Sequence, residues 1–80
     1  MNKEEIESKI KDIIVDKNGV PPEEVTDNAD FKGDLGMDSL DCVDLIMEVE
    51  KEFSISVTDD EAVKVSCLSD CVELVENHLK

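Results

Sequence analysis

Apolar residues recur at helical spacing in three separate stretches of this chain, which restricts it to a mainly helical fold. The first stretch covers residues 3–17, the second covers 39–53, and the third follows Ser66. In the first stretch, the apolar residues at i, i+4, i+7 and i+8 are Ile6, Ile10, Ile13 and Ile14. In the third, the residues at i, i+3, i+4, i+7 and i+11 are Leu68, Cys71, Val72, Val75 and Leu79. Each stripe can bury one face of a helix, so we expect three amphipathic helices that pack together.

Local signals set the ends of the first two helices. Asn18 and Gly19 both tolerate the left-handed conformation that ends a helix, so the first helix is expected to stop after about Lys17. Asp38 is a good N-cap, and Asp41 places a negative charge in the first turn, where the helix dipole favours it. The second helix is therefore expected over residues 39–53.

A fourth, short helix is predicted between the second and third stretches. Thr58 followed three residues later by Glu61 matches a capping box, so this helix should begin at Asp59 and run to about Val65. Ser66 can then cap the last helix.

Earlier in the chain, two consecutive prolines at residues 21–22 predict an extended exit from the first helix.

These elements define an all-α fold, a small four-helix bundle of three longer helices and one short helix, in a single domain over residues 1–80. A long loop over residues 23–38 joins the first two helices, and its apolar side chains Val25, Phe31 and Leu35 are expected to pin it to the core. Loops of this length are usually functional or disordered, and the apolar anchors favour function. A passive connector is the alternative.

The charge balance limits the partners. The chain has 22 acidic residues against 8 basic ones, all lysines, and a formal net charge of −14. Such a field repels nucleic acids and anionic membranes and favours basic surfaces on other proteins. We therefore expect no nucleic-acid partner and no membrane insertion. A domain this small buries only about 60 to 65% of the surface that its unfolded chain exposes, so its core is thin. A large active-site cavity is therefore not expected.

The setting is expected to be the cytoplasm. No apolar run approaches the ~18 residues that a membrane span needs, and the N-terminus is acidic, unlike a signal region. Three cysteines, an odd number without the spacing of a disulfide framework, fit a reducing compartment. We expect a monomer.

The second helix carries two apolar faces. One face, expected to join the core, consists of Cys42, Leu45, Ile46, Val49 and Phe53. A nearly opposite group consists of Leu40, Val43 and Met47, bordered by Asp41, Asp44 and Glu48. A thin domain cannot bury both faces, so the second group is predicted to form an exposed apolar strip with an acidic rim, as in a docking site. Isolated exposed apolar residues without a role are the alternative.

Ser39 stands at the start of this helix, and its surroundings argue against catalysis. A serine nucleophile needs a general base and oxyanion donors. The only histidine, His78, is on the last helix, and Asp38 and Asp41 would oppose an oxyanion. We therefore expect no enzyme activity. Ser39 is then either an ordinary first residue of a helix or an exposed hydroxyl that a transferase modifies, because a helix N-terminus favours an attached phosphate.

The stretch Asp34-Leu35-Gly36-Met37-Asp38-Ser39-Leu40 resembles the 4′-phosphopantetheine attachment motif of acyl carrier proteins. The resemblance covers nearly the entire chain. It includes Glu24-Val25-Thr26 through Phe31, the helix from Asp41 to its Glu-Lys-Glu-Phe end, Asp59-Asp60-Glu61-Ala62 through Val65, and the final helix.

This resemblance implies that Ser39 is esterified by 4′-phosphopantetheine, donated from coenzyme A by a separate Mg²⁺-dependent phosphopantetheinyl transferase. The prosthetic thiol would then hold acyl groups as thioesters. Side chains near the serine would meet Lys and Arg patches on partner enzymes, and carried over by position these are Asp38, Leu40, Asp41, Asp44, Met47 and Glu50. With Val43 and Glu48 from the exposed strip, those from Leu40 to Glu50 make up the predicted partner face, and Asp38 is assigned with Ser39 to the cofactor site.

Fatty-acid synthesis is the expected pathway, supported by the Asp-Ser-Leu form of the motif, the acidic helix and the lack of a fused domain. The alternatives are a carrier for a polyketide, aminoacyl or lipid-modifying pathway, and an acidic adaptor that is never modified. In the family the acyl chain can enter the core, and this core of small aliphatic, Met and Cys side chains fits either a slot or compact packing. Lys51, where many members carry an acid, departs from the common pattern, as do Cys67 and Cys71.

The same cysteines raise the alternative of a metal site. Cys67 and Cys71 stand four residues apart, and Cys42 and His78 would complete four zinc ligands. However, Cys42 and Cys71 fall on the core stripes, where cysteine behaves as a small apolar residue. There is also no CxxC spacing and no EF-hand calcium loop. We therefore expect no metal site.

Overall fold

The computed structural model describes residues 2–79 and has the predicted all-α architecture. The helices are α1 (Lys3–Asn18), α2 (Ser39–Phe53), α3 (Asp59–Ala62) and α4 (Leu68–Leu79), with a 3₁₀ turn, η1, at Pro22–Glu24. Three longer helices and one short helix are thus confirmed, and α2 has the predicted bounds. Within the described residues the only strand-like pairing is an isolated bridge between Asp30 and Cys67.

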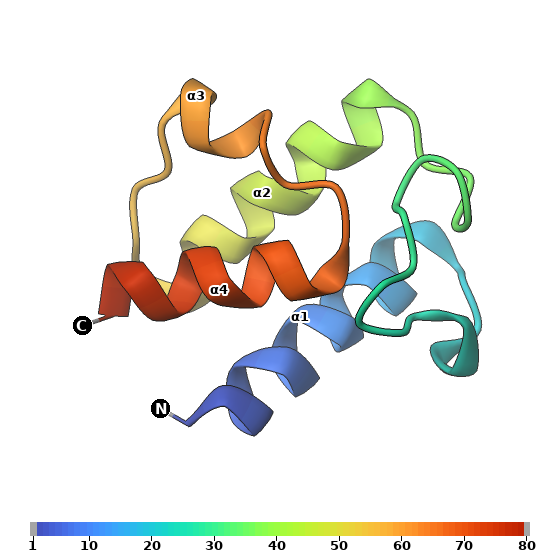
Figure 1. The fold of residues 1–80 in the computed structure, drawn as a ribbon, viewed down its shortest axis with the longest axis horizontal. Helices are drawn as coiled ribbons and strands as arrows, with labels where there is room; N and C mark the ends of the chain where they lie inside the picture. The colour runs from blue at the N-terminus through green and yellow to red at the C-terminus, as the bar shows by residue number, and fades with distance from the viewer. Residues whose placement is uncertain (1, 80) are drawn as a thin grey trace.

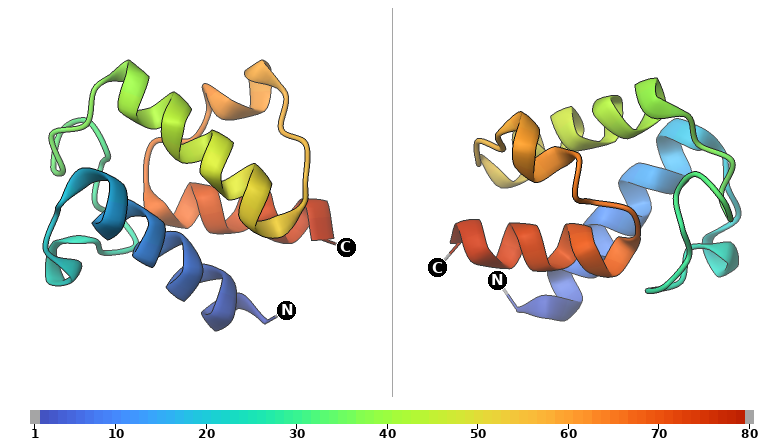
Figure 2. Two further views of the ribbon diagram at one scale, coloured as in Figure 1. Left: turned by 180° about the vertical axis from the view of Figure 1, so that it is seen from behind. Right: turned by 45° about the horizontal axis from the view of Figure 1, so that its top comes forward.

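Helix α1 packs against both α2 and α4, and these contacts enclose the core. Figure 1 shows α3 on the far side of α2 and α4 from α1, and Figure 2 shows the same order from two other directions. All three longer helices and the loop between α1 and α2 supply the core, whose buried members include Ile6, Ile10, Ile14, Phe31, Leu45, Val49, Phe53, Leu68, Cys71, Val72 and Val75. Each fully buried aliphatic side chain of this kind contributes about 1.5 to 3 kcal/mol.

The predicted cap signals work as expected at three helix ends. Gly19 adopts φ +66° at the end of α1, and its N–H donates to the Val15 carbonyl. At the start of α3, the Thr58 hydroxyl accepts from the Glu61 N–H while the Glu61 carboxylate accepts from the Thr58 N–H. These pairings satisfy backbone groups that a helix end would otherwise leave unpaired. The third case, the start of α2, belongs to the candidate site.

Helix α3 is shorter than predicted. It ends at Ala62 rather than near Val65, and the N–H groups of Lys64 and Val65 donate three residues back, to Glu61 and Ala62. Such bonds tighten the chain into a turn. The turn brings the Ser66 carbonyl to the Phe31 N–H, at 2.8 Å, so a tertiary bond accompanies the early stop.

Two other local predictions are wrong. Ser66 does not cap α4 with its oxygen, because its hydroxyl donates to Oδ2 of Asp70, at 2.9 Å, and α4 begins at Leu68. Pro21 is extended as predicted, but Pro22 starts the turn η1, where its fixed φ suits the first position.

The loop over residues 19–38 is fastened to the start of α4. Val25 and Phe31 are buried and Leu35 is half-buried against the core, so the three predicted anchors are confirmed. The Ser69 N–H donates to the Asp27 carbonyl, and the Met37 N–H donates to the Phe31 carbonyl. Since the last of these bonds lies two residues before Ser39, the loop fixes the position at which α2 begins.

Candidate functional site

Ser39 is the first residue of α2 and is exposed. Just before it, Asp38 adopts an extended backbone and caps the helix, with Oδ1 accepting from the Asp41 N–H at 2.9 Å. The Asp41 carboxylate accepts in turn from the Asp38 N–H at 3.2 Å. This reciprocal pair confirms Asp38 as the N-cap and holds the first turn of α2.

The chain is guided into this turn by a buried side chain that sequence reasoning missed. Met37 is only 4% exposed and packs in the core cluster. Gly36, with φ +69°, allows the reversal that turns the Met37 side chain inward. Met37 is buried two residues before Ser39, and the serine itself remains on the surface. In the sequence, the burial of Met37 could have been predicted from its position as an apolar residue next to a loop glycine.

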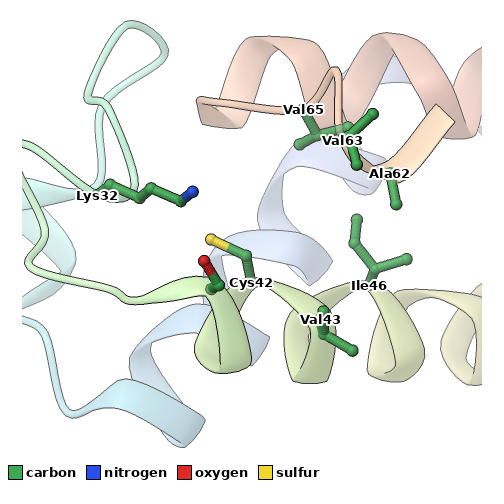
Figure 3. Close-up of a pocket in the computed structure, with 8 residues that line it drawn as sticks. Lys32, Cys42, Val43, Ile46, Ala62, Val63 and Val65 are labelled. Carbon is green, nitrogen blue, oxygen red and sulfur yellow. The ribbon is translucent and has the colours of Figure 1, made fainter. Parts of the chain in front are cut away.

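A partly open hollow of about 190 Å³ lies between α2 and α3, with Ser39 among its lining residues. From α2 it is also lined by Cys42, Val43 and Ile46, and from the α3 side by Ala62, Val63 and Val65. Figure 3 shows Cys42 and Ile46 of α2 pointing toward Ala62 and the chain that follows it, with Lys32 reaching toward the hollow from the loop before α2. The site thus joins an exposed hydroxyl to a mainly apolar space.

The predicted apolar strip on α2 is exposed. Leu40, Val43 and Met47 are 74%, 54% and 51% exposed, while the opposite face buries Leu45, Ile46, Val49 and Phe53. Val63, 80% exposed on the other side of the hollow, extends the apolar surface across to α3. Sequence reasoning did not predict that Val63 is exposed. The signal was available, because a helix of one turn is too small to bury every apolar residue in and next to it.

The acids predicted for the partner face differ in their surroundings. Asp44 is exposed. Oε1 of Glu48 lies 3.8 Å from Nζ of Lys17 and 3.9 Å from Nζ of Lys51. The first ion pair connects α2 to α1, and the second lies within α2. Oε2 of Glu50 accepts from the Val57 N–H at 3.0 Å, which ties down the segment after α2. Glu48 and Glu50 therefore have partners within the chain.

The cysteines lie in distinct environments. Burial raises the pKa of the Cys71 thiol to about 12, as expected for a core residue. Burial also raises the pKa of Cys42, and the nearby Lys32 ammonium opposes that rise.

His78 pairs with Glu61 through Nε2 and Oε2 at 2.9 Å. Within residues 2–79, no three or more His, Cys, Asp or Glu side chains are grouped so as to hold a metal ion.

Comparison with known proteins agrees with this geometry. Residues 8–75 match the family described as the phosphopantetheine attachment site. Acyl carrier proteins from two strains of Porphyromonas gingivalis are each 46% identical over 76 residues, which is 95% of this chain and 97% of theirs.

The fold and these matches define a phosphopantetheine-dependent carrier, a class that holds its cargo on a prosthetic group and performs no catalysis itself. Within that class, the chain belongs to the acyl carrier protein family, and its cofactor is 4′-phosphopantetheine.

The structure offers a place that fits this cofactor. A transferase needs an exposed hydroxyl with free space beside it, and Ser39 combines exposure with a position at the hollow. Carriers of this family interact with biosynthetic enzymes, and one residue of the exposed strip on α2, Val43, lines the hollow together with Ser39. None of the helices in the described part of the chain has the length and apolar content to cross a bilayer.

Proposed function

We propose that Ser39 carries 4′-phosphopantetheine and that the chain presents acyl groups on it to the enzymes of fatty-acid synthesis. The observation that carries the proposal is the exposure of Ser39 at the first position of α2, beside the hollow between α2 and α3. The prosthetic group supplies a thiol that binds acyl groups as thioesters, a chemistry for which the chain itself provides only the attachment point.

The residues around Ser39 present the hydroxyl and take no part in bond making. Asp38 and Asp41 bind each other's backbone N–H groups, which keeps the first turn of α2 formed. His78, the only histidine, pairs with Glu61, so the geometry gives the serine no imidazole base. Activation of the hydroxyl is therefore assigned to the transferase.

The partner face is proposed to centre on Leu40, Val43 and Met47, with Asp38, Asp41 and Asp44 at its rim. Apolar side chains that are half or more exposed, beside the exposed carboxylate of Asp44 and the capping-box carboxylates of Asp38 and Asp41, suit a partner surface with an apolar centre and Lys or Arg around it. Glu48 and Glu50 stand further along α2 and must share their carboxylates with Lys17, Lys51 and the Val57 N–H. They are assigned a secondary role.

Fatty-acid synthesis is favoured by the Asp-Ser-Leu motif and the acidic α2, and a carrier for another cargo is the runner-up. The hollow of about 190 Å³ is smaller than the roughly 300 to 1,000 Å³ of pockets that enclose drug-sized ligands. In this conformation it accommodates a short acyl group, and a longer chain requires α2 and α3 to separate. The bacterial relatives and the strongly acidic charge fit a monomeric carrier of the cytoplasm.

Intact-protein mass spectrometry tests the attachment site. The chain is incubated with coenzyme A, Mg²⁺ and a broad-specificity phosphopantetheinyl transferase. The wild type and the control Ser8→Ala, an exposed serine on α1, should each gain one phosphopantetheine group, and Ser39→Ala should gain none. An unmodified wild type would favour the acidic adaptor, and a modified Ser39→Ala would place the cofactor elsewhere.

The pathway is tested with the modified chain. It is supplied to a reconstituted set of freestanding fatty-acid synthesis enzymes, and the acyl groups on it are identified by mass spectrometry. Successive two-carbon elongation supports the fatty-acid role. Loading only by enzymes that activate amino acids or polyketide units would assign the chain to the runner-up.

A further inference from the structure

Lys32 is the one basic residue among those that line the hollow next to Ser39. It belongs to the loop before α2, and its backbone N–H donates to Oδ1 of Asp30 at 3.1 Å. Figure 3 shows the side chain extended toward the hollow, with the ammonium pointing toward Cys42 of α2. A local turn therefore fixes the base of this side chain while its charged end faces the start of α2.

The charges around this ammonium are otherwise negative. The Lys32 ammonium lowers the pKa of the Cys42 thiol, whereas the carboxylates of Asp30, Asp38 and Asp41 raise it, so all four charges act on this side chain. Asp38 and Asp41 use their carboxylates in the capping box, and Asp30 accepts from the Lys32 backbone. Within residues 2–79 no carboxylate lies within 4.0 Å of the Lys32 ammonium, whereas the ammonium groups of Lys17 and Lys51 both contact Glu48.

A phosphodiester on Ser39 would add a further negative charge to this acidic turn. The N-terminus of α2 favours an anion through its dipole, but the carboxylates of Asp38 and Asp41 beside the serine oppose it. A cation that lines the same hollow would offset this repulsion and draw the phosphate toward the hollow, away from the open solvent.

We propose that Lys32 is a positioning residue that binds the phosphate of the prosthetic group and directs the group toward the hollow between α2 and α3. The proposal rests on the attachment of that group to Ser39. It concerns the resting orientation of the group and assigns Lys32 no part in the transfer of acyl groups.

The first test measures the reactivity of individual lysines before and after modification. Apo and fully modified chains are treated with acetic anhydride, and the acetylation rate of each lysine is followed by peptide mass spectrometry. An ammonium paired with an exposed phosphate should react about two- to five-fold more slowly. We expect this protection at Lys32 and none at Lys11, which lies on α1 beside Glu4 and Glu7.

Salt separates charge pairing from simple covering by the prosthetic group. Raising NaCl from about 0.02 to 0.5 M shortens the Debye length from roughly 20 Å to roughly 4 Å and should remove most of the protection. Protection that is unchanged at high salt would mean that the group covers Lys32 sterically, and this result would overturn the proposal.

Phosphorus-31 NMR of the modified chain observes the phosphate directly. The wild type, Lys32→Arg and the control Lys11→Gln should share one phosphodiester resonance and one salt dependence. Lys32→Gln should have a different resonance with a weaker salt dependence, because the cation near the phosphate is removed. Circular dichroism should confirm that this variant is folded. Identical spectra for all four chains would overturn the proposal.

These outcomes are distinct from a failure of the attachment itself. If Ser39 is not the attachment site, the mass gain persists in Ser39→Ala or is absent in the wild type. If only the role of Lys32 is wrong, every Lys32 variant gains the group while acetylation and phosphorus-31 spectra do not respond.

Discussion

Nε2 of His78, near the end of α4, lies 2.9 Å from Oε2 of Glu61 in α3. The other oxygen of the same carboxylate accepts from the N–H and the hydroxyl of Thr58, at 3.2 Å each. One side chain thus closes the capping box of α3 and ties α3 to α4. A helix of one turn has little stability of its own, so these bonds help to keep α3 over the hollow.

Glu61→Gln should therefore destabilise the fold in a pH-dependent way. The pKa of Glu61 is lowered from its ordinary 4.5, first by the Thr58 backbone N–H and then by the bond to His78. A carboxylate with a lowered pKa in the folded state stabilises the fold above its unfolded pKa, and this contribution is lost as pH falls through the folded value. The melting temperature of the variant should lie below that of the wild type at about pH 6, and the gap should narrow toward about pH 3.

Asp60→Asn is the matched control, because it removes one negative charge from the adjacent, exposed position of the same helix. Its melting temperature should follow that of the wild type across the pH range. If Glu61→Gln behaves like this control, the negative charge of Glu61 contributes nothing to the fold.

The cap of α2 predicts a contrast between two substitutions of Asp38. Alanine removes the side-chain oxygen that accepts from the Asp41 N–H, whereas asparagine keeps such an oxygen without the charge. Asp38→Ala should lower the free energy of unfolding by about 1 kcal/mol, and Asp38→Asn by a few tenths at most. Urea unfolding measures both. Equal losses in the two variants would mean that charge, rather than capping, is the source of the effect.

Sequence predicted the helix ends well where one side chain pairs with a nearby backbone group. Asp38 with Asp41 and Thr58 with Glu61 are three residues apart, and Gly19 ends α1 through its own backbone. These are local interactions, so local sequence contains the information. The exposed face of α2 was likewise predictable, because helical spacing alone separates its two apolar groups.

The features that sequence did not predict depend on contacts distant in the chain. The end of α3 coincides with a bond between Ser66 and Phe31, and the burial of Met37 depends on how the loop packs across the core. The approach of Lys32 to the hollow requires the loop, α2 and α3 together. No pattern within a single segment contains such relations, which explains why sequence reasoning missed Met37, Val63 and Lys32 as neighbours of Ser39.

Met37 and Met47 give a test of these two environments with the same chemical change. Met37 is 4% exposed in the core, and Met47 is 51% exposed on α2. Met37→Ala should cost about 2 to 3 kcal/mol of stability in urea unfolding, and Met47→Ala should stay within about 0.5 kcal/mol. Similar losses for both variants would contradict the assignment of the two faces.

Ionic strength should stabilise this chain. With a net charge of −14, repulsion among carboxylates disfavours the compact state, and salt screens that repulsion. The melting temperature should rise as NaCl is increased from about 0.02 to 0.5 M. A neutral osmolyte such as sucrose does not screen charge, so it serves to distinguish screening from general effects on the surface. A melting temperature that falls or stays constant with NaCl would show that self-repulsion is not a dominant cost.

Reversal of charge at Asp44 tests the proposed partner face. Asp44 is exposed beside the apolar strip and has no ion-pair partner within 4.0 Å among residues 2–79, whereas Glu48→Lys would also disturb Lys17 and Lys51. Asp44→Lys should reduce the rate constant for loading by a transferase with a basic docking patch about three- to ten-fold, mainly through slower association. Asp12→Lys, the same change on an exposed position of α1, should load at nearly the wild-type rate. Circular dichroism melts of both variants should resemble the wild type. A collapse of the Asp44→Lys fold, or equal loading rates for the two variants, would remove Asp44 from the docking surface.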